Sequence, residues 1–325
     1  MRIGVVPPVP MEPFVASAHE AVNLWSAFFT APDRSALLET ARLAGFPENY
    51  SAYARCLYGL IFDLRIEAVY YPQPGVPKEV LKAIEMAAEQ GVESVPFAFP
   101  LFRNDQRLSQ ALEALRRRLG VDPAVLEAVV QRLHEVRTVL RRYDGLQMRT
   151  AAFSSRAYVS MLAQAMDPRG DLEGLKRRIE RGILDYRDEG RERWTRVGIV
   201  GLPPYRESFY ETLESMRAVA VYDEWGLENN PMSPSMDLTF LYHTCSLPYG
   251  LKRRLERVQR EAATRRLQAV VLAVEYLCES LKDEGYFRVN LGLPVYVFEN
   301  RGGDRLSSAE ERGLKRLLEE QVAAP

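Results

Sequence analysis

RVGIVGLPPYRESFYETLESMRAVAVYDEW, residues 196–225, contains the pattern that decides the fold. The apolar, β-branched run VGIVG (197–201) ends just before two prolines, a helical segment follows, and AVAVYDEW (218–225) is apolar again. This order is typical of a strand, a helix and a second strand. Because two parallel strands need a long crossover connection, the pattern predicts a parallel pair.

Four further apolar runs have the length of buried strands: EAVYYP (67–72), ESVPFAFP (93–100), LQAVVLAVEY (267–276) and LPVYVFE (293–299). Helical segments separate them, and runs that are apolar on both faces indicate strands covered on both sides. The sequence therefore predicts an α/β protein with two Rossmann-like, doubly wound lobes, each built on a parallel sheet.

Two long segments have helical periodicity instead. Apolar residues recur at helix-like intervals from Pro13 to about Leu64, and again through residues 105–190, which are rich in Arg, Leu and Glu. We therefore expect helical N-terminal and middle segments. A chain of 325 residues is expected to divide into about two domains, and we place them at residues 1–190 and 191–325.

Composition excludes several classes of protein. The chain has 43 basic and 44 acidic residues, so no overall positive field indicates nucleic acid or an anionic membrane as a partner. We find no signal-peptide pattern and no long uninterrupted apolar run, and we expect a cytoplasmic protein without a membrane segment. Three cysteines without paired spacing argue against a disulfide framework.

The carboxyl ends of the predicted strands are the expected place for a ligand, because open parallel sheets bind ligands there. Gly201, Glu224, Cys278 and Glu299 all lie at or just beyond such ends. Motifs of other common ligand and catalytic sites are missing from the sequence. Histidine spacing suggests no zinc site, and neither a GxGxxG turn nor a GxSxG elbow is present.

Several stretches together resemble one known family. They are VPPVPMEPFVASA (6–18), NYSAYARCLYGLIFD (49–63), EAVYYPQPGVPKEV (67–80), the segment 196–225 quoted above, residues 245–280 from CSLPYG to LCES, and LGLPVYVFEN (291–300). Their order and spacing are similar to those of the subunits of 2-hydroxyacyl-CoA dehydratases and benzoyl-CoA reductases.

The resemblance implies a dimer of two-lobed subunits and, in active subunits, a [4Fe–4S] cluster held by three cysteines. An ATP-dependent activator supplies the electron that the cluster passes to a CoA thioester, so the reaction is that of a lyase or an oxidoreductase. Thiolates are suitable ligands for cluster iron because they are soft and negatively charged.

The ligand positions that the resemblance implies are only partly occupied by cysteine. Cys278 falls where the family's third ligand falls, but the first position is Ser51 and the second is Gly75. A rearranged site of Cys56, Cys245 and Cys278 is one alternative. Packing is the other, because a free cysteine usually behaves as a small buried hydrophobic residue.

The predicted substrate site lies between the lobes. The strand ends would line it with Gly201, Tyr205, Glu224, Cys278 and Glu299, opposite Ser51 or Tyr53. Arg253 and Arg254 are candidates for the phosphates of a CoA thioester, because guanidinium groups bind phosphate in a bidentate manner. The sequence assigns no catalytic residue.

Three functions remain open at this point. The first is a cluster-poor subunit that acts on a CoA thioester beside a homologous, cluster-bearing partner in a heterodimer. The second is an active iron–sulfur dehydratase or reductase with a rearranged or serine-completed cluster. The third is a ligand-binding or regulatory protein that keeps the fold and has lost the redox chemistry.

Overall fold

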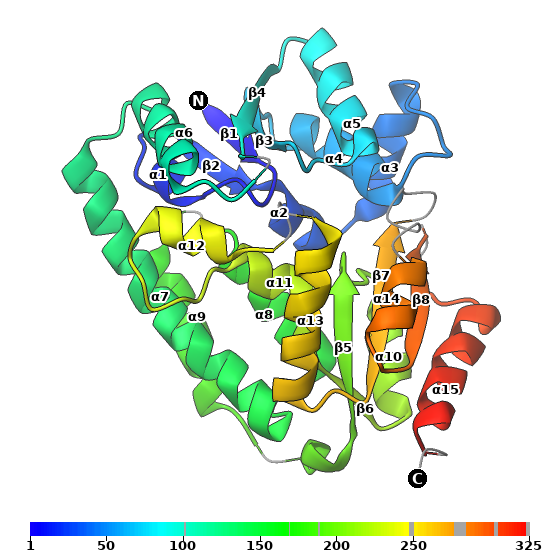
Figure 1. Ribbon diagram of the computed structural model, residues 1–325. Coiled ribbons are helices and arrows are strands. Elements are labelled where there is room, and N and C mark those ends of the chain that lie inside the picture. Colours follow the sequence, from blue (N-terminus) through cyan, green and yellow to red (C-terminus); the bar gives the residue numbers. More distant parts are fainter. Residues whose placement is uncertain are drawn as a thin grey trace.

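The protein contains two parallel sheets of four strands each, placed one above the other (Figure 1). The computed structural model describes residues 1–100, 102–168, 170–187, 189–246, 250–275, 284–301 and 305–322. Both sheets have the same strand order pattern, with the first strand of each lobe in an inner position. The fold is thus α/β with two doubly wound lobes, as predicted.

The first sheet has the order β2 (Glu20–Asn23), β1 (Arg2–Val5), β3 (Ala68–Gln73) and β4 (Glu93–Ala98). Successive residues of β3 pack on opposite faces: Tyr70 joins the core under α1 (Glu12–Val15) and α6 (Asp105–Arg118), whereas Val69 joins the core under other helices. Those helices are α3 (Arg34–Leu43), α4 (Ala52–Asp63) and α5 (Lys78–Glu89). Both faces of the sheet are therefore covered.

The second sheet has the order β6 (Ala218–Asp223), β5 (Thr195–Gly201), β7 (Ala269–Glu275) and β8 (Val295–Asn300). Every residue of β6 and β7 is buried, as expected of strands covered on both faces. One face carries α13 (Leu251–Arg265) and α14 (Glu284–Asn290), and the other carries α10 (Glu207–Ser215) and α15 (Ser308–Val322) (Figure 1).

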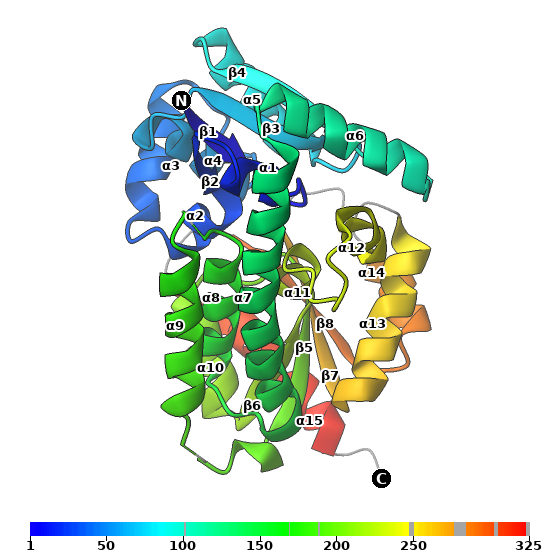
Figure 2. The ribbon, with the colours of Figure 1, turned by 90° about the vertical axis from the view of Figure 1, so that its left-hand side faces the viewer.

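The helical middle segment connects the lobes. Helix α7 (Pro123–Thr150) contacts α1 of the first lobe and β6 of the second, and it runs along both lobes in Figure 2. Helix α8 (Ser155–Ala165) packs on β6 and on α2 (Leu24–Thr30), and α9 (Leu172–Leu184) packs on α7. The short segments η1 (Arg191–Arg193), α11 (Glu224–Asn229) and α12 (Leu238–Thr244) complete the order.

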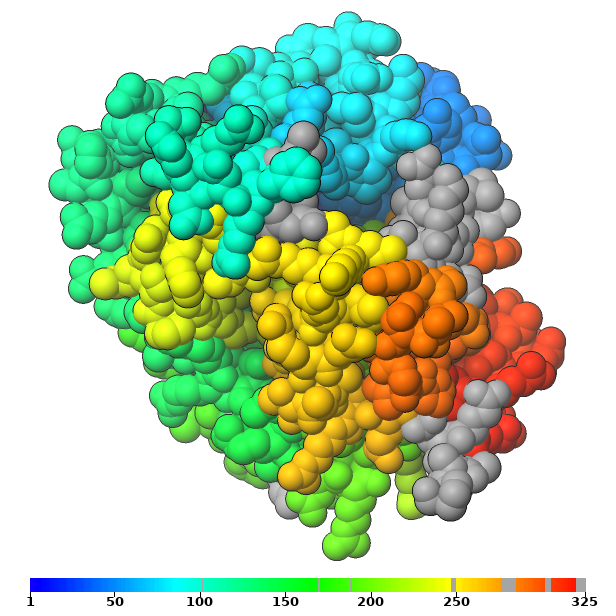
Figure 3. All heavy atoms as spheres, in the orientation of Figure 1, coloured from blue at the N-terminus to red at the C-terminus, as the bar shows by residue number. Residues whose placement is uncertain are grey.

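A buried polar cluster holds α1, α7 and α12 together. Arg137 Nη2 lies 2.5 Å from Glu12 Oε1, and the Tyr242 hydroxyl donates to Glu12 Oε2 at 2.8 Å. Helices α6 and α12 also touch, and the space-filling view shows their regions in contact across the boundary between the lobes (Figure 3). Side-chain pairing thus reinforces the covalent connection of the two lobes.

The predicted strands are confirmed in both lobes, and the predicted middle segment is helical. The expectation of a helical opening is wrong in part, because β2 falls within it and β1 precedes it. Strand β2 has only two fully buried residues, so it carries little of the apolar pattern that identifies a strand. Within the described ranges, no helix combines the length and the apolar character needed to cross a bilayer.

Candidate functional site

A cavity of about 190 Å³ lies where the carboxyl ends of the two sheets face each other. It is bounded by the residues that end β1 and β3 in the first lobe and β5 and β7 in the second. In each sheet these two strands are neighbours whose connections run in opposite directions. The cavity therefore lies at the topological switch points of both sheets, where parallel α/β folds bind ligands.

The first lobe contributes proline-rich strand ends. Pro7 and Pro8 follow β1, and Pro74 and Gly75 follow β3. Proline has no backbone N–H to donate to a sheet, so these residues end the strands at the cavity. Gly75 has a φ of +120°, and a Cβ built on it would meet nothing within 4 Å. The space next to Gly75 at the cavity is thus not filled by other atoms of the described residues.

The start of α4 forms the second wall of the first lobe. Ser51 is the N-cap of this helix, and its Oγ accepts a hydrogen bond from Ala54 N at 3.2 Å. The backbone N–H of Tyr53 donates to Glu275 Oε2 of the second lobe at 3.3 Å. This hydrogen bond connects the two lobes directly at the cavity.

The second lobe supports the cavity with a buried ion pair. Glu224 binds Arg254 through both carboxylate oxygens, at 2.7 and 2.6 Å, and accepts the backbone N–H of Gly201 at 2.7 Å. Gly201 has a φ of +94°, and a Cβ there would collide with the carbonyl oxygen of Ala273. Only glycine fits this close approach of β5 and β7.

The carboxyl group of Glu275 is the most perturbed acid of the cavity wall. Burial raises its pKa to about 8, the nearby Glu79 carboxylate adds to the rise, and the Tyr53 N–H and Arg55 oppose it. Burial likewise raises the pKa of the Tyr53 hydroxyl. A neutral carboxylic acid and a neutral phenol are therefore expected at pH 7, and both can donate hydrogen bonds.

Three buried polar atoms of cavity residues have no hydrogen-bond partner within the described part of the chain. They are Tyr53 Oη, Trp225 Nε1 and Glu275 Oε1. Buried polar groups of native proteins usually have a hydrogen-bond partner, so these three atoms are candidates for contacts with a ligand.

The structure brings some of the predicted site residues together and leaves others apart. Ser51, Tyr53, Gly201 and Arg254 line the cavity, and Glu224 lies directly behind Arg254 and Gly201. Arg253 is the neighbour of Arg254 on α13 but does not line the cavity.

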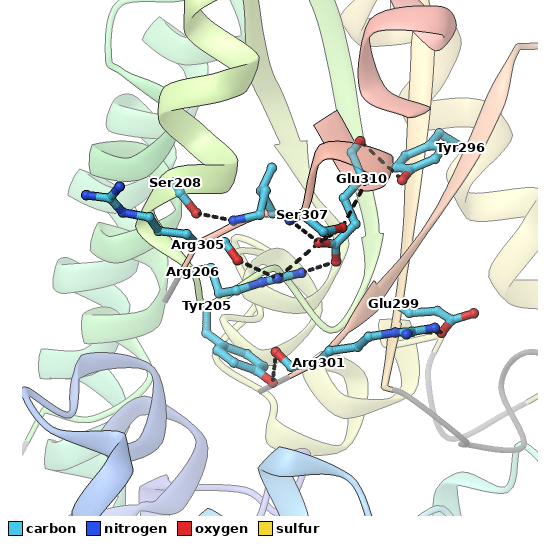
Figure 4. Close-up of polar contacts among 10 residues, drawn as sticks. Tyr205, Arg206, Ser208, Tyr296, Glu299, Arg301, Arg305, Ser307 and Glu310 are labelled. Carbon is cyan, nitrogen blue, oxygen red and sulfur yellow. Dashed lines mark hydrogen bonds and ion pairs between the residues drawn. The ribbon is translucent and has the colours of Figure 1, made fainter. Parts of the chain in front are cut away.

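Tyr205 and Glu299 lie outside the cavity lining, and both contact Arg301 (Figure 4). The Tyr205 hydroxyl donates to the carbonyl oxygen of Arg301 at 3.4 Å, and the Arg301 guanidinium pairs with Glu299 at 2.7 Å. Next to them, Arg206 binds Glu310 of α15 at 2.5 Å. These contacts fix the C-terminal helix against the start of α10.

The cysteines do not form a common site in the described structure. Cys56 is buried in α4, with its Sγ 3.8 Å from the carbonyl oxygen of Arg34, and burial raises its pKa to about 12. Cys245 is buried in a different hydrophobic cluster, and burial raises its pKa as well. Cys278 lies outside the described residues.

A three-cysteine [4Fe–4S] site does not fit the described residues. Ser51 uses its oxygen as a helix cap, Gly75 has no side chain, and Cys56 and Cys245 are buried in separate hydrophobic clusters. Across the described ranges, no group of three His, Cys, Asp or Glu side chains is placed to hold a metal ion.

Glu275 and Trp225 are among the cavity residues that the sequence did not indicate. Glu275 lies within the predicted strand 267–276, and Trp225 ends the predicted strand 218–225. Glu275 could have been recognised as the lone carboxylate at the end of a strand that is apolar on both faces. A buried charge is costly, so such a residue often has a function.

Fold and site together define a two-lobed α/β protein with a cavity between the carboxyl ends of two parallel sheets. Residues 33–311 match the family described as 2-hydroxyglutaryl-CoA dehydratase, D-component. The match covers most of the chain, and the protein belongs to this family. A comparison with curated proteins gives no significant match.

Proposed function

We propose that the protein is the cluster-poor subunit of a dehydratase-type pair and binds the acyl part of a CoA thioester between its lobes. A homologous, cluster-bearing subunit would be its partner, and an ATP-dependent activator would serve that partner in the cytoplasm. The observation that carries this proposal is the lining of the cavity. Ser51 and Gly75 occupy the positions where the family resemblance expects two cluster cysteines.

The size and lining of the cavity suit the acyl end of such a ligand. A cavity of about 190 Å³ is below the usual range of about 300–1,000 Å³ for drug-sized ligands. Its walls are formed mainly by proline, valine and leucine side chains, which favour a short apolar chain. The nucleotide part of CoA would extend outward, where Arg253 is a candidate for a phosphate contact.

The two alternative functions have less support. A cluster built from Cys56, Cys245 and Cys278 would need two cysteines that are buried in separate hydrophobic clusters. A ligand-binding or regulatory protein would use the same cavity. It would differ from the proposed subunit only in having no homologous partner.

The test is calorimetry with acyl-CoA esters on the isolated chain and on its complex with a cysteine-complete homologue, purified anaerobically. We expect copurification and binding of one acyl-CoA per complex. Pro77→Trp, at the exposed rim of the cavity, should weaken binding by about tenfold, which corresponds to about 1.4 kcal/mol. Gln90→Trp, at the far end of α5 from Pro77, is the matched control and should bind normally.

The ligand assignment and the role as a subunit can be contradicted separately. If neither the chain nor the complex binds any acyl-CoA, the ligand assignment is wrong. If the chain binds acyl-CoA alone and no homologue copurifies with it, the role as a subunit is wrong and the ligand-binding alternative is favoured.

A further inference from the structure

We propose that the cavity recognises the acceptor oxygen of an acyl group through three hydrogen-bond donors: the Tyr53 hydroxyl, the Trp225 indole N–H and the Glu275 carboxyl. The oxygen is either a thioester carbonyl or the carboxyl of the free acid. This inference rests on the proposed function, because it assigns the group that the ligand presents in the same cavity.

The three residues are linked through Trp25 and through the backbone of Tyr53. The Trp25 ring contacts the rings of both Tyr53 and Trp225, with centroid separations of 5.2 and 5.7 Å in edge-to-face geometry. The backbone of Tyr53 in turn donates to Glu275. Tyr53, Trp225 and Glu275 all line the same cavity. Residues from three elements, α4, α11 and β7, thus meet at one small cavity.

The chemistry of these groups selects the ligand atom. Tyr53 and Glu275 are only 5% and 7% exposed, and their Oη and Oε1 atoms, like Trp225 Nε1, have no partner within the described part of the chain. An indole N–H can only donate, and a phenol or a protonated carboxyl donates equally well. An acceptor oxygen complements all three.

The surroundings of Glu275 keep its carboxyl in the donating form. The titratable and charged groups that face it are Tyr53, Arg55 and Cys56 from α4, Glu79 from α5, Tyr205 from the segment before α10, and Arg254 from α13 across the cavity. Arg254 is bound to Glu224, and Asn300 is the neighbour of Glu275 in β8. Burial outweighs Arg55, so the pKa of Glu275 lies at about 8.

The ligand oxygen has to enter from the cavity. The three polar atoms are closed to solvent in the structure, so binding of the oxygen requires that their side chains rotate toward the cavity. An apolar wall and a set of donors then discriminate an acyl compound from an alkyl compound of the same shape, because the alkyl compound leaves the donors unsatisfied.

The experiment compares four probes on the anaerobically purified complex: a short-chain acyl-CoA, the S-alkyl-CoA thioether of the same length, the corresponding free acid and the corresponding alcohol. We expect the carbonyl compound to bind at least about tenfold more tightly than its thioether, the effect of about one buried hydrogen bond. Trp225→Phe and Tyr53→Phe each keep an aromatic ring but remove the donor, and each should reduce this ratio severalfold.

The pH dependence gives a second readout. In the wild type the ratio should fall above about pH 8, where Glu275 loses its proton. Glu275→Gln keeps a neutral donor at this position and should make the ratio independent of pH from 6 to 9. A thermal unfolding curve for each variant identifies any that fail to fold.

The outcomes distinguish the three-donor inference from the proposed binding of a CoA thioester. Equal binding of thioester and thioether, or a ratio that Trp225→Phe, Tyr53→Phe and Glu275→Gln leave unchanged at every pH, overturns the inference and leaves the proposed function standing. Binding of the free acid but not of the thioester supports the donors and overturns the CoA assignment. Binding of none of the four probes overturns both.

Discussion

Glu224 and Arg254 form a bidentate ion pair beneath the cavity, with Glu224 only 1% and Arg254 14% exposed at the side chain. The pair joins the end of β6 to α13, and through Gly201 N it also reaches the end of β5. The pair therefore fixes the ends of β5 and β6 and helix α13 next to the cavity.

Arg254→Met is expected to destabilise the protein by about 3–5 kcal/mol, because it leaves the Glu224 carboxylate buried without its partner. The measurement is the free energy of unfolding in urea. Arg42→Met is the matched control, since the Arg42–Glu39 pair has the same chemistry at half-exposed positions and should cost less than about 1 kcal/mol. Equal losses in the two variants would contradict a structural role for the buried pair.

Gly201→Ala is expected to destabilise the protein and to weaken acyl-CoA binding. The positive φ alone costs about 1–3 kcal/mol, and the collision with the Ala273 carbonyl oxygen forces β5 away from β7. Gly285→Ala is the control, because a Cβ there meets nothing within 4 Å and alanine favours the helix by up to about 1 kcal/mol. Unchanged stability and binding in Gly201→Ala would show that the cavity tolerates movement of these strands.

The strands and the position of the cavity could be predicted because they depend on local patterns. Apolar runs such as 197–201 and 267–276 define buried parallel strands, and their carboxyl ends lie at the cavity. Strand β2 could not be predicted from its sequence alone. It is short, and its pairing with β1 becomes evident only in the folded sheet.

The details of the site depend on contacts between distant residues. Tyr53 and Glu275 are far apart in sequence and meet across the lobes, and the environment that raises the Glu275 pKa comes from both. Glu299, in contrast, is a strand-end residue that does not line the cavity. Its position at a strand end suggested the cavity, but its neighbour Arg301 holds it elsewhere. Sequence pattern places a residue at a strand end without fixing the direction of its side chain.

Glu275→Gln should change how stability depends on pH. The pKa of Glu275 is raised from 4.5 to about 8, so the folded state holds a proton that the unfolded state releases in this range. Its contribution to stability is therefore complete below about pH 4.5 and is lost as the pH rises to about 8, with a slope of at most about 1.4 kcal/mol per pH unit.

The measurement is urea unfolding of wild type and Glu275→Gln between pH 5 and pH 9. As the pH rises to about 8, the unfolding free energy of the wild type should fall relative to that of the variant. Above this pH the difference should stay constant. Asp223, whose pKa burial raises to about 7, contributes in the same direction and is present in both proteins. Parallel curves would mean that Glu275 is not buried in the neutral form.

Tyr242→Phe tests the connection between the lobes. It removes the hydroxyl that donates to the buried Glu12 and should cost about 1–3 kcal/mol in urea unfolding. Tyr286→Phe, at an exposed position on α14, is the control and should change stability by less than about 0.5 kcal/mol. Similar values for the two variants would contradict a stabilising role for the Glu12, Arg137 and Tyr242 cluster.

The central claim is that this subunit binds an acyl compound without a cluster of its own. The most direct measurement is a calorimetric titration with an acyl-CoA in which iron and acid-labile sulfide of the isolated chain and of the complex are determined on the same preparations. The account predicts less than one iron atom per isolated chain and one acyl-CoA bound per complex. Four irons per isolated chain, lost in Cys278→Ala together with the binding, would contradict it.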